Sequence, residues 1–254
     1  MKMLLKLIVI ILISSSILSR EIGETEITTE DGIEVYQNEK YYLLKKNVSI
    51  NSDNFNLNAD NVKIIFNQNM YDITELNAKG NVIFKSTEFK MDGIGQTLKF
   101  DIQNEKLKVE GLNSELITED IQMFSDGYIE VNNLTGEFTL RGVNSKLINA
   151  DIIIDSDLIN GVFANNFTNK DIKFLNIIDS EISYVKNNDT EMYAKKINYD
   201  YDTSIIELIE SVTIIRNDEK ITGDYGTLDT KNNSYKIKSN NQKKVKILIQ
   251  NNEQ

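Results

Sequence analysis

The chain has 254 residues, 28 basic and 39 acidic side chains, and a formal net charge of -11. It contains no Cys and no His, which excludes disulfides, thiolate nucleophiles, Cys- or His-ligated metals and every catalytic triad built on His. The acidic surface repels phosphate backbones, so we expect no nucleic-acid partner. We also expect no catalytic residues, no metal site and no cofactor, and therefore no enzyme.

The amino terminus is typical of an export signal. Lys2 and Lys6 give a positive start, an apolar run covers residues 7–13, and serines follow at residues 14–16. The run is too short and too polar for a bilayer span, which needs about 20 apolar residues. We predict a signal peptide over residues 1–20; the alternative is a retained single membrane anchor.

From about residue 30 onward, apolar and polar residues alternate in short segments. In chain order these are 48–50, 55–59, 62–66, 82–84, 89–91, 98–102, 107–109, 138–140, 197–201, 235–237 and 245–249. Such alternation places one apolar face inward and one polar face outward. Asn- and Asp-rich clusters such as 51–54 and 187–189 supply turn positions between the segments. The pattern predicts an all-β fold of many short antiparallel strands, with no helix after the signal.

The least regular stretch is residues 141–190, where apolar runs such as 152–154 and 177–178 blur the alternation. No Gly/Ser-rich linker marks a boundary. We therefore predict one β domain over residues 21–254, with two lobes that meet at a seam near 141–190 as the alternative.

An internal repeat begins at Asn47, Gly80 and Ser211. Each copy is an alternating strand, a short turn and a second strand that ends in a small residue beside an acid. These endings are Ala59-Asp60, Asp92-Gly93 and Gly223-Asp224. One hairpin cannot bury its apolar face alone, so stacked hairpins that share a stripe of apolar side chains are expected to form an elongated structure.

Over residues 47–109 and 192–237 this pattern resembles the OstA-like repeat of the LptA/LptC lipopolysaccharide-transport family. The resemblance implies an elongated open β-jelly roll, in which two antiparallel sheets face each other and hold lipid acyl chains between them. It also implies a periplasmic protein of Gram-negative bacteria that binds lipopolysaccharide and carries it from the inner to the outer membrane for outer-membrane assembly. Members join edge to edge, with themselves or with other β-jelly-roll transport components. An uncleaved signal implies a membrane-anchored member.

The candidate lipid-binding residues are the apolar positions that the alternation places inward. They are Val48, Ile50, Leu57, Val82, Phe84, Leu98, Phe100, Phe138, Leu140, Val212, Ile214 and Leu228. The other interpretation of each is ordinary core, and a slip of one residue exchanges the two faces of a strand.

Two rival functions belong to other classes. The first is an exported structural or adhesive β-repeat protein with a closed core. The second is a polysaccharide-degrading β-solenoid enzyme, which the lack of His, Trp and a convincing pair of acids disfavours.

Overall fold

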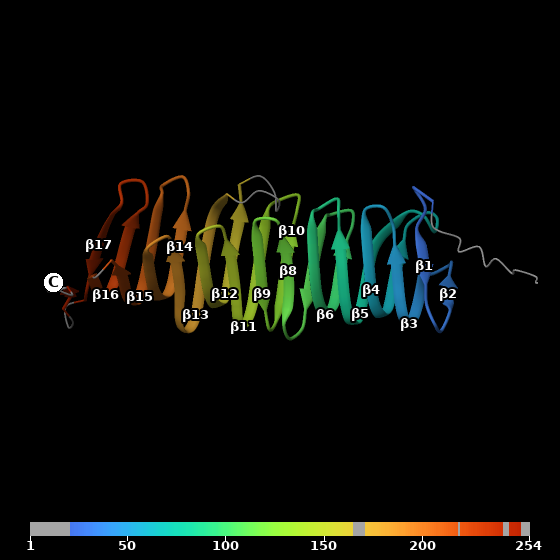
Figure 1. The fold of residues 1–254 in the computed structure, drawn as a ribbon, viewed down its shortest axis with the longest axis horizontal. Helices are drawn as coiled ribbons and strands as arrows, with labels where there is room; N and C mark the ends of the chain where they lie inside the picture. The colour runs from blue at the N-terminus through green and yellow to red at the C-terminus, as the bar shows by residue number, and fades with distance from the viewer. Residues whose placement is uncertain (1–20, 165–170, 218, 241–243, 250–254) are drawn as a thin grey trace, which may run out of the picture.

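The structure is a computed structural model that describes residues 21–164, 171–217, 219–240 and 244–249; the predicted signal at residues 1–20 lies outside the described residues. Within these ranges the chain forms strands and no helix. The strands are β1 (Glu26–Thr28), β2 (Ile33–Tyr36), β3 (Tyr41–Asn51), β4 (Phe55–Phe66), β5 (Ile73–Ser86), β6 (Met91–Asp101), β7 (Lys106–Glu110), β8 (Ser114–Thr118), β9 (Ile121–Ser125), β10 (Tyr128–Asn132), β11 (Glu137–Asn149), β12 (Ile152–Phe163), β13 (Ile172–Asn187), β14 (Thr190–Asp200), β15 (Ile205–Arg216), β16 (Glu219–Asp229), β17 (Ser234–Lys238) and β18 (Lys246–Ile249). They follow one another along the long axis of the molecule (Figure 1).

Most strands are long and bend in the middle, so that one strand contributes to two sheets. In β4, residues 55–58 pair with 83–86 of β5, and residues 61–66 pair with 73–79 of the same strand, with a register shift between the two blocks. The short strands β7 and β8 are two halves of one such bent strand, since both pair with β6. The result is an elongated, open β-jelly roll of two facing antiparallel sheets. The alternation predicts the antiparallel strands, the repeat predicts the elongated shape, and the family resemblance implies the jelly roll.

The roll has two sheets, and its two long sides differ. Sheet I contains β2, β7, β10, β17 and the halves of the long strands that pair with them; sheet II contains β1, β8, β9, β18 and the other halves. The spine is the row of bends that joins the two sheets. The mouth lies opposite, between the hairpin turns of sheet I, such as 201–204, and those of sheet II, such as 188–189.

The bends depend on residues that tolerate left-handed backbone. Gly80 and Asn81 of β5 have φ of 79° and 47°. A Cβ on Gly80 would lie 2.1 Å from Oδ2 of Asp60, so the close approach of β4 also requires glycine there. Asn81 Nδ2 donates to the same carboxylate at 3.0 Å. Asp60, the acid of the first repeat copy, therefore connects the bend of β4 to the bend of β5.

Buried serines line the inner side of the spine in the middle of the molecule. Ser125 Oγ donates to the Arg141 carbonyl at 3.0 Å and lies 3.0 Å from Ser145 Oγ. Ser156 Oγ donates to the Ile178 carbonyl at 2.9 Å and lies 2.9 Å from Ser183 Oγ. A bend interrupts the ladder of backbone hydrogen bonds, and an unpaired buried carbonyl is costly. These hydroxyls satisfy carbonyls at the interrupted positions and are small enough for the two sheets to converge.

In the second repeat copy, the small residue at the bend differs from the one that the sequence predicts. Gly95, and not Gly93, occupies the last inward position of sheet II before the bend of β6, because Gly95 pairs with Val82 on the other side of the β5 bend. Gly93 lies one inward position nearer the mouth. Its missing side chain leaves room for the ring of Phe84, which would be 2.3 Å from a Cβ at this position.

The apolar core runs between the sheets along the length of the described molecule. The alternation assigns inward positions correctly in most strands, but it fails at the chain end. Val245, Ile247 and Ile249 are 40%, 56% and 64% exposed, and Leu248 between them is 51% exposed. Strand β18 is the last strand of sheet II, and all four of its residues are exposed. Strands β11 to β14 pair in chain order through the predicted seam, while the assignment of one domain or two lobes stays a prediction.

Candidate functional site

The structure places all twelve candidate residues on the inner faces of the two sheets. Eleven are buried, with exposures of 6% or less, and Phe100 is half-buried and packs against the core from the mouth. They do not form one cluster. Seven lie between β3 and β6, Phe138 and Leu140 lie on β11, and Val212, Ile214 and Leu228 lie on β15 and β16. Their contact with lipid stays a prediction.

Four phenylalanines fill the mouth between β4 and β6. Phe55 and Phe84 come from sheet II, Phe89 from the turn that follows β5, and Phe100 from sheet I. The ring centroids of Phe55 lie 6.2 Å from those of both Phe84 and Phe100, and Phe89 meets Phe100 edge-on at 6.0 Å. Aromatic pairs at this spacing attract each other beyond their buried area. Here the two sheets are joined across the mouth by side-chain packing.

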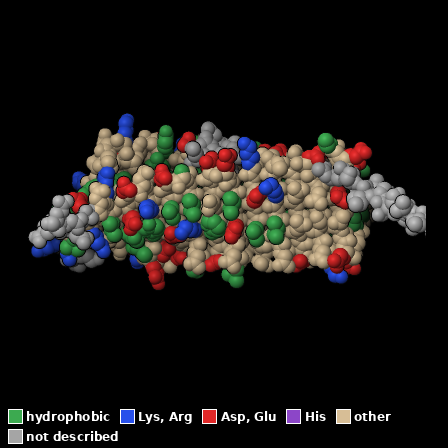
Figure 2. Space-filling model, viewed as in Figure 1, with side chains coloured by type: hydrophobic (Ala, Val, Ile, Leu, Met, Phe, Trp, Pro, Cys, Tyr) green, Lys and Arg blue, Asp and Glu red, His purple; other side chains and the backbone are tan. Residues whose placement is uncertain are grey.

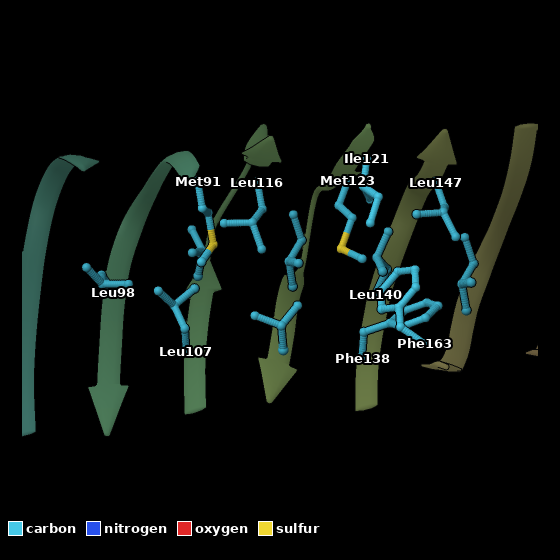
Figure 3. Close-up of a cluster of buried hydrophobic side chains, with 14 of the residues drawn as sticks. Met91, Leu98, Leu107, Leu116, Ile121, Met123, Phe138, Leu140, Leu147 and Phe163 are labelled. Atoms are coloured by element: carbon cyan, nitrogen blue, oxygen red, sulfur yellow. The ribbon is translucent and has the colours of Figure 1, made fainter. Parts of the chain in front are cut away.

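A second aromatic pair lies near the middle of the roll. Phe138 of β11 and Phe163 of β12 stack with centroids 4.5 Å apart, and Phe163 is 1% exposed. Figure 3 shows the two rings side by side, with Leu140 next to them and Met123 and Ile121 on a neighbouring strand. A Cβ at Gly161, opposite Phe138, would lie 2.3 Å from the Phe138 ring. The side chains of this region fill the space between the sheets.

The space between the sheets opens beyond this pair. A cavity of about 140 Å³ lies between β12 and β16, and apolar side chains form most of its wall. The wall consists of Ile152, Leu175, Ile177, Val185, Asn187, Ile197, Tyr199, Ile206 and Thr230. The mostly apolar wall makes this space suited to apolar groups.

Two further hollows flank this cavity at the mouth. One, of about 300 Å³, shares Ile152, Asn187 and Tyr199 with the cavity and extends to the turn at 150–151. The other, of about 370 Å³, shares Asn187 and Thr230 with it and extends to Arg216. The three spaces follow one another along the mouth, with the apolar cavity in the centre and a polar hollow at the Arg216 end. The arrangement suits an amphipathic ligand whose apolar part lies between the sheets.

The titratable groups near the cavity show no arrangement for acid–base chemistry. Burial is the main cause of the raised pKa of Tyr199, which keeps this phenol neutral and its ring part of an apolar wall. Within the described residues, no group of three or more Asp or Glu side chains could hold a metal ion. In the same part of the chain, no helix is long and apolar enough to cross a membrane.

The sequence interpretation missed most of the cavity wall. Ile197 and Tyr199 belong to an alternating segment that was noted, but were not selected. Ile152, Leu175, Ile177 and Val185 lie in the irregular stretch 141–190, where neighbouring isoleucines point to opposite faces. Ile177 is 1% exposed and Ile178 is 39% exposed. Only the alternation of inward and outward positions along the strand distinguishes Ile177 from Ile178, and this alternation is weak in the stretch 141–190.

Comparison with known proteins gives the family. The sequence profile described as LptA/(LptD N-terminal domain) LPS transport protein matches residues 29–156, just over half of the chain. No curated protein matches the sequence. Among solved structures, one similar chain is LptH from Pseudomonas aeruginosa, described as the LptA homologous periplasmic component of the conserved lipopolysaccharide transport device. It is 14% identical, and the match covers 52% of this chain and 95% of LptH with a TM-score of 0.42. The chain therefore belongs to the LptA/LptD N-terminal domain family of lipopolysaccharide transport proteins, which are not enzymes.

Proposed function

We propose that the protein is a periplasmic lipopolysaccharide-binding component of a bridge that carries lipopolysaccharide from the inner to the outer membrane. The observation that carries this proposal is the apolar cavity between the two sheets at the mouth, in a chain that belongs to a lipopolysaccharide transport family. The acyl chains lie between the sheets and the sugar-phosphate headgroup stays at the polar hollow near Arg216. The chain reaches the periplasm through its amino-terminal signal.

The affinity in this proposal comes from apolar area removed from water, at about 25 cal/mol per Å² before ordering costs. An acyl chain is longer than the cavity of about 140 Å³ can hold. Binding therefore requires the sheets to separate along the mouth. Separation is easier over β12–β16 than over β4–β6, because the phenylalanines of the latter join the two sheets across the mouth. Cargo enters first in the carboxy-terminal half.

The bridge itself is assembled end to end in this proposal. Among the described residues, the strands at the two ends of the roll each pair with one neighbour and leave the other backbone edge open, which is a template for pairing with another sheet. Their charges are opposite. The end strands β1 and β2 carry Glu26 and Glu34 and no basic residue, whereas β17 and β18 carry Lys236, Lys238 and Lys246 and no acid. Figure 2 shows basic side chains at the end of the molecule that carries β17 and β18. Head-to-tail contact between copies is thus favoured over head-to-head contact.

Lipid extraction tests the transport proposal. The protein purified from the periplasm of a lipopolysaccharide-producing host is extracted with organic solvent, and the extract is analysed by mass spectrometry. We expect lipid A species bound in near-stoichiometric amount. A protein that is folded, monodisperse and free of acylated lipid contradicts the proposal and favours a structural β-repeat protein with a closed core.

Charge reversal at one end tests the assembly. Changing Glu26 and Glu34 together to Lys places like charges at the contact, so self-association measured by analytical ultracentrifugation is expected to weaken at low salt. The matched control reverses Glu115 and Glu137, which lie on strands in the middle of the roll. Restored association on mixing this variant with a Lys236→Glu, Lys238→Glu, Lys246→Glu variant supports head-to-tail contact. Unchanged association of the end variant contradicts it.

A further inference from the structure

Arg216 is an inward-facing cation at the mouth of the groove. It lies at the end of β15 with the same parity as Val212 and Ile214, which are each 1% exposed. Its Nη1 donates a long hydrogen bond of 3.5 Å to the Asn233 carbonyl. Within the described part of the chain, it forms no ion pair. Inward-facing charges near an apolar interior are usually paired, so this guanidinium has unused capacity to bind an anion.

The carboxylate placed opposite Arg216 has another partner. Glu219 faces Arg216 across the β15–β16 hairpin. Its Oε2 accepts a hydrogen bond of 3.0 Å from the hydroxyl of Tyr235. Thr190 lies opposite Arg216 on the other neighbouring strand. The guanidinium is thus flanked by a hydroxyl and by a carboxylate that is held toward Tyr235.

The hollow around Arg216 is polar and roomy. Its volume is about 370 Å³, and Asn187, Asn188, Thr190, Asn217 and Asn233 contribute to its wall together with one acid, Asp189. Amide and hydroxyl groups of this kind donate hydrogen bonds to phosphate oxygens, and a guanidinium binds two of them at once. A single positive charge here matters more because the protein as a whole is acidic, with a net charge of -11.

The same hollow adjoins the apolar cavity. Asn187 and Thr230 belong to the walls of both. A ligand with a phosphate at Arg216 therefore lies next to the cavity beside Tyr199, which is the nearest apolar space for an acyl chain. Most residues that line the hollow and the cavity follow residue 156, where the match to the family ends.

We propose that Arg216 and the asparagines around it form a phosphate-binding site that holds the phosphorylated headgroup of an acylated lipid, while the acyl chain occupies the adjoining cavity. This proposal rests on the proposed transport function and specifies phosphate as the chemical group of the lipid that the protein recognises. It predicts selectivity for phosphorylated over phosphate-free lipids. The selectivity is expected to decline with salt, because the hollow is open to solvent.

Calorimetric titration with three probes tests the site. The probes are oleoyl lysophosphatidic acid, mono-oleoylglycerol and inorganic phosphate, with both lipids kept below their critical micelle concentrations. They separate the contributions of chain and phosphate. The variant is Arg216→Gln. The matched control is Arg141→Gln, which removes the same charge from an exposed position near the spine on β11.

The site predicts that the wild type and Arg141→Gln bind lysophosphatidic acid about tenfold more tightly than mono-oleoylglycerol, the equivalent of about 1.4 kcal/mol. Arg216→Gln is expected to lose this difference and to keep its affinity for mono-oleoylglycerol. An unfolding midpoint within error of the wild type shows that the Arg216→Gln variant is folded.

The remaining outcomes overturn specific parts of the account. Equal binding of both lipids by the wild type, or an unchanged preference in Arg216→Gln, overturns the phosphate site and leaves lipid transport standing. Inorganic phosphate that binds as tightly as lysophosphatidic acid indicates an anion site without an acyl requirement, which also overturns it. Failure of both lipids to bind the wild type overturns the proposed function as well.

Discussion

At the scale of single residues, the interior depends on phenylalanines that lie over glycines. Phe84 pairs with Gly93 across β5 and β6, and Phe138 pairs with Gly161 across β11 and β12. In both pairs a Cβ on the glycine would lie 2.3 Å from the ring. Glycine weakens a strand, and a ring that covers it restores the lost packing. These glycines are therefore specified by the ring opposite and not by backbone conformation.

Gly93→Ala is expected to destabilise the protein by about 1–3 kcal/mol, because the added methyl group forces the buried Phe84 ring out of place. Chemical denaturation measures the loss. The change Phe84→Leu in the same chain makes room for the methyl group, so the double variant should lose less than the sum of the two single variants. Ile94→Ala, at an outward neighbour that is 45% exposed, is the control with little expected effect. Additive losses contradict the packing argument.

At the scale of strands, the sequence predicts the halves of each strand well and their connection poorly. In β3 the inward residues on the two sides of the bend are Leu44 and Val48, an even step that leaves the alternation intact. In β4 they are Ala59 and Val62, an odd step that breaks it. A bend and a hairpin turn both use polar residues with left-handed backbone, so local pattern cannot separate them. The pairing of distant residues decides between the two, and one sequence does not show that pairing.

The irregular stretch 141–190 has the same cause. In β13 the inward positions next to the bend are Ile177 and Ser183, and the bend between them contains Asp179 and Ser180. Asp157 of β12 accepts hydrogen bonds from Ser180 N at 3.1 Å and Oγ at 2.6 Å. The sequence interpretation did not anticipate this longer bend, and as a result it missed the cavity wall on either side of it.

The Asp157–Ser180 contact should make the stability of the protein depend on pH. Hydrogen bonds from the Ser180 side chain and backbone lower the pKa of Asp157 below its ordinary value of 3.8. Because the folded-state pKa is the lower one, the stabilisation is fully present above 3.8 and is lost as the pH falls through the folded value.

Asp157→Asn should therefore lower the thermal midpoint at pH 7, by an amount that corresponds to less than about 1 kcal/mol because water screens the contact. The difference in midpoint should shrink as the pH falls below 3.8, because protonation removes the charge that accepts the Ser180 hydrogen bonds. Thermal unfolding of the wild type and the variant between pH 2 and pH 7 measures this. A deficit that is the same at both ends of the range contradicts the role of the charge.

At the scale of the whole molecule, the two halves of the described structure differ in how the mouth is filled. Phenylalanines from both sheets meet across the mouth over β4–β6, and a stacked pair fills the middle of the interior. An apolar cavity lies over β12–β16 between two hollows, of which the one at Arg216 is polar. Composition and alternation predict the fold class, and the repeat points to the family. Neither predicts this difference, because it depends on which large side chains meet across the two sheets.

The central claim is that lipopolysaccharide lies between the two sheets, and photo-crosslinking from matched tyrosine positions tests it most directly. Tyr199 contributes to the cavity wall, whereas Tyr225 of β16 lies on the outer face of sheet I, with its hydroxyl bonded to Glu207 at 2.8 Å. Each is replaced in turn by p-benzoylphenylalanine in a lipopolysaccharide-producing host, irradiated in cells and probed for a lipopolysaccharide adduct. The account predicts a strong adduct at 199 and none above background at 225. Equal adducts at both positions, or none at 199 in a folded protein, would contradict it.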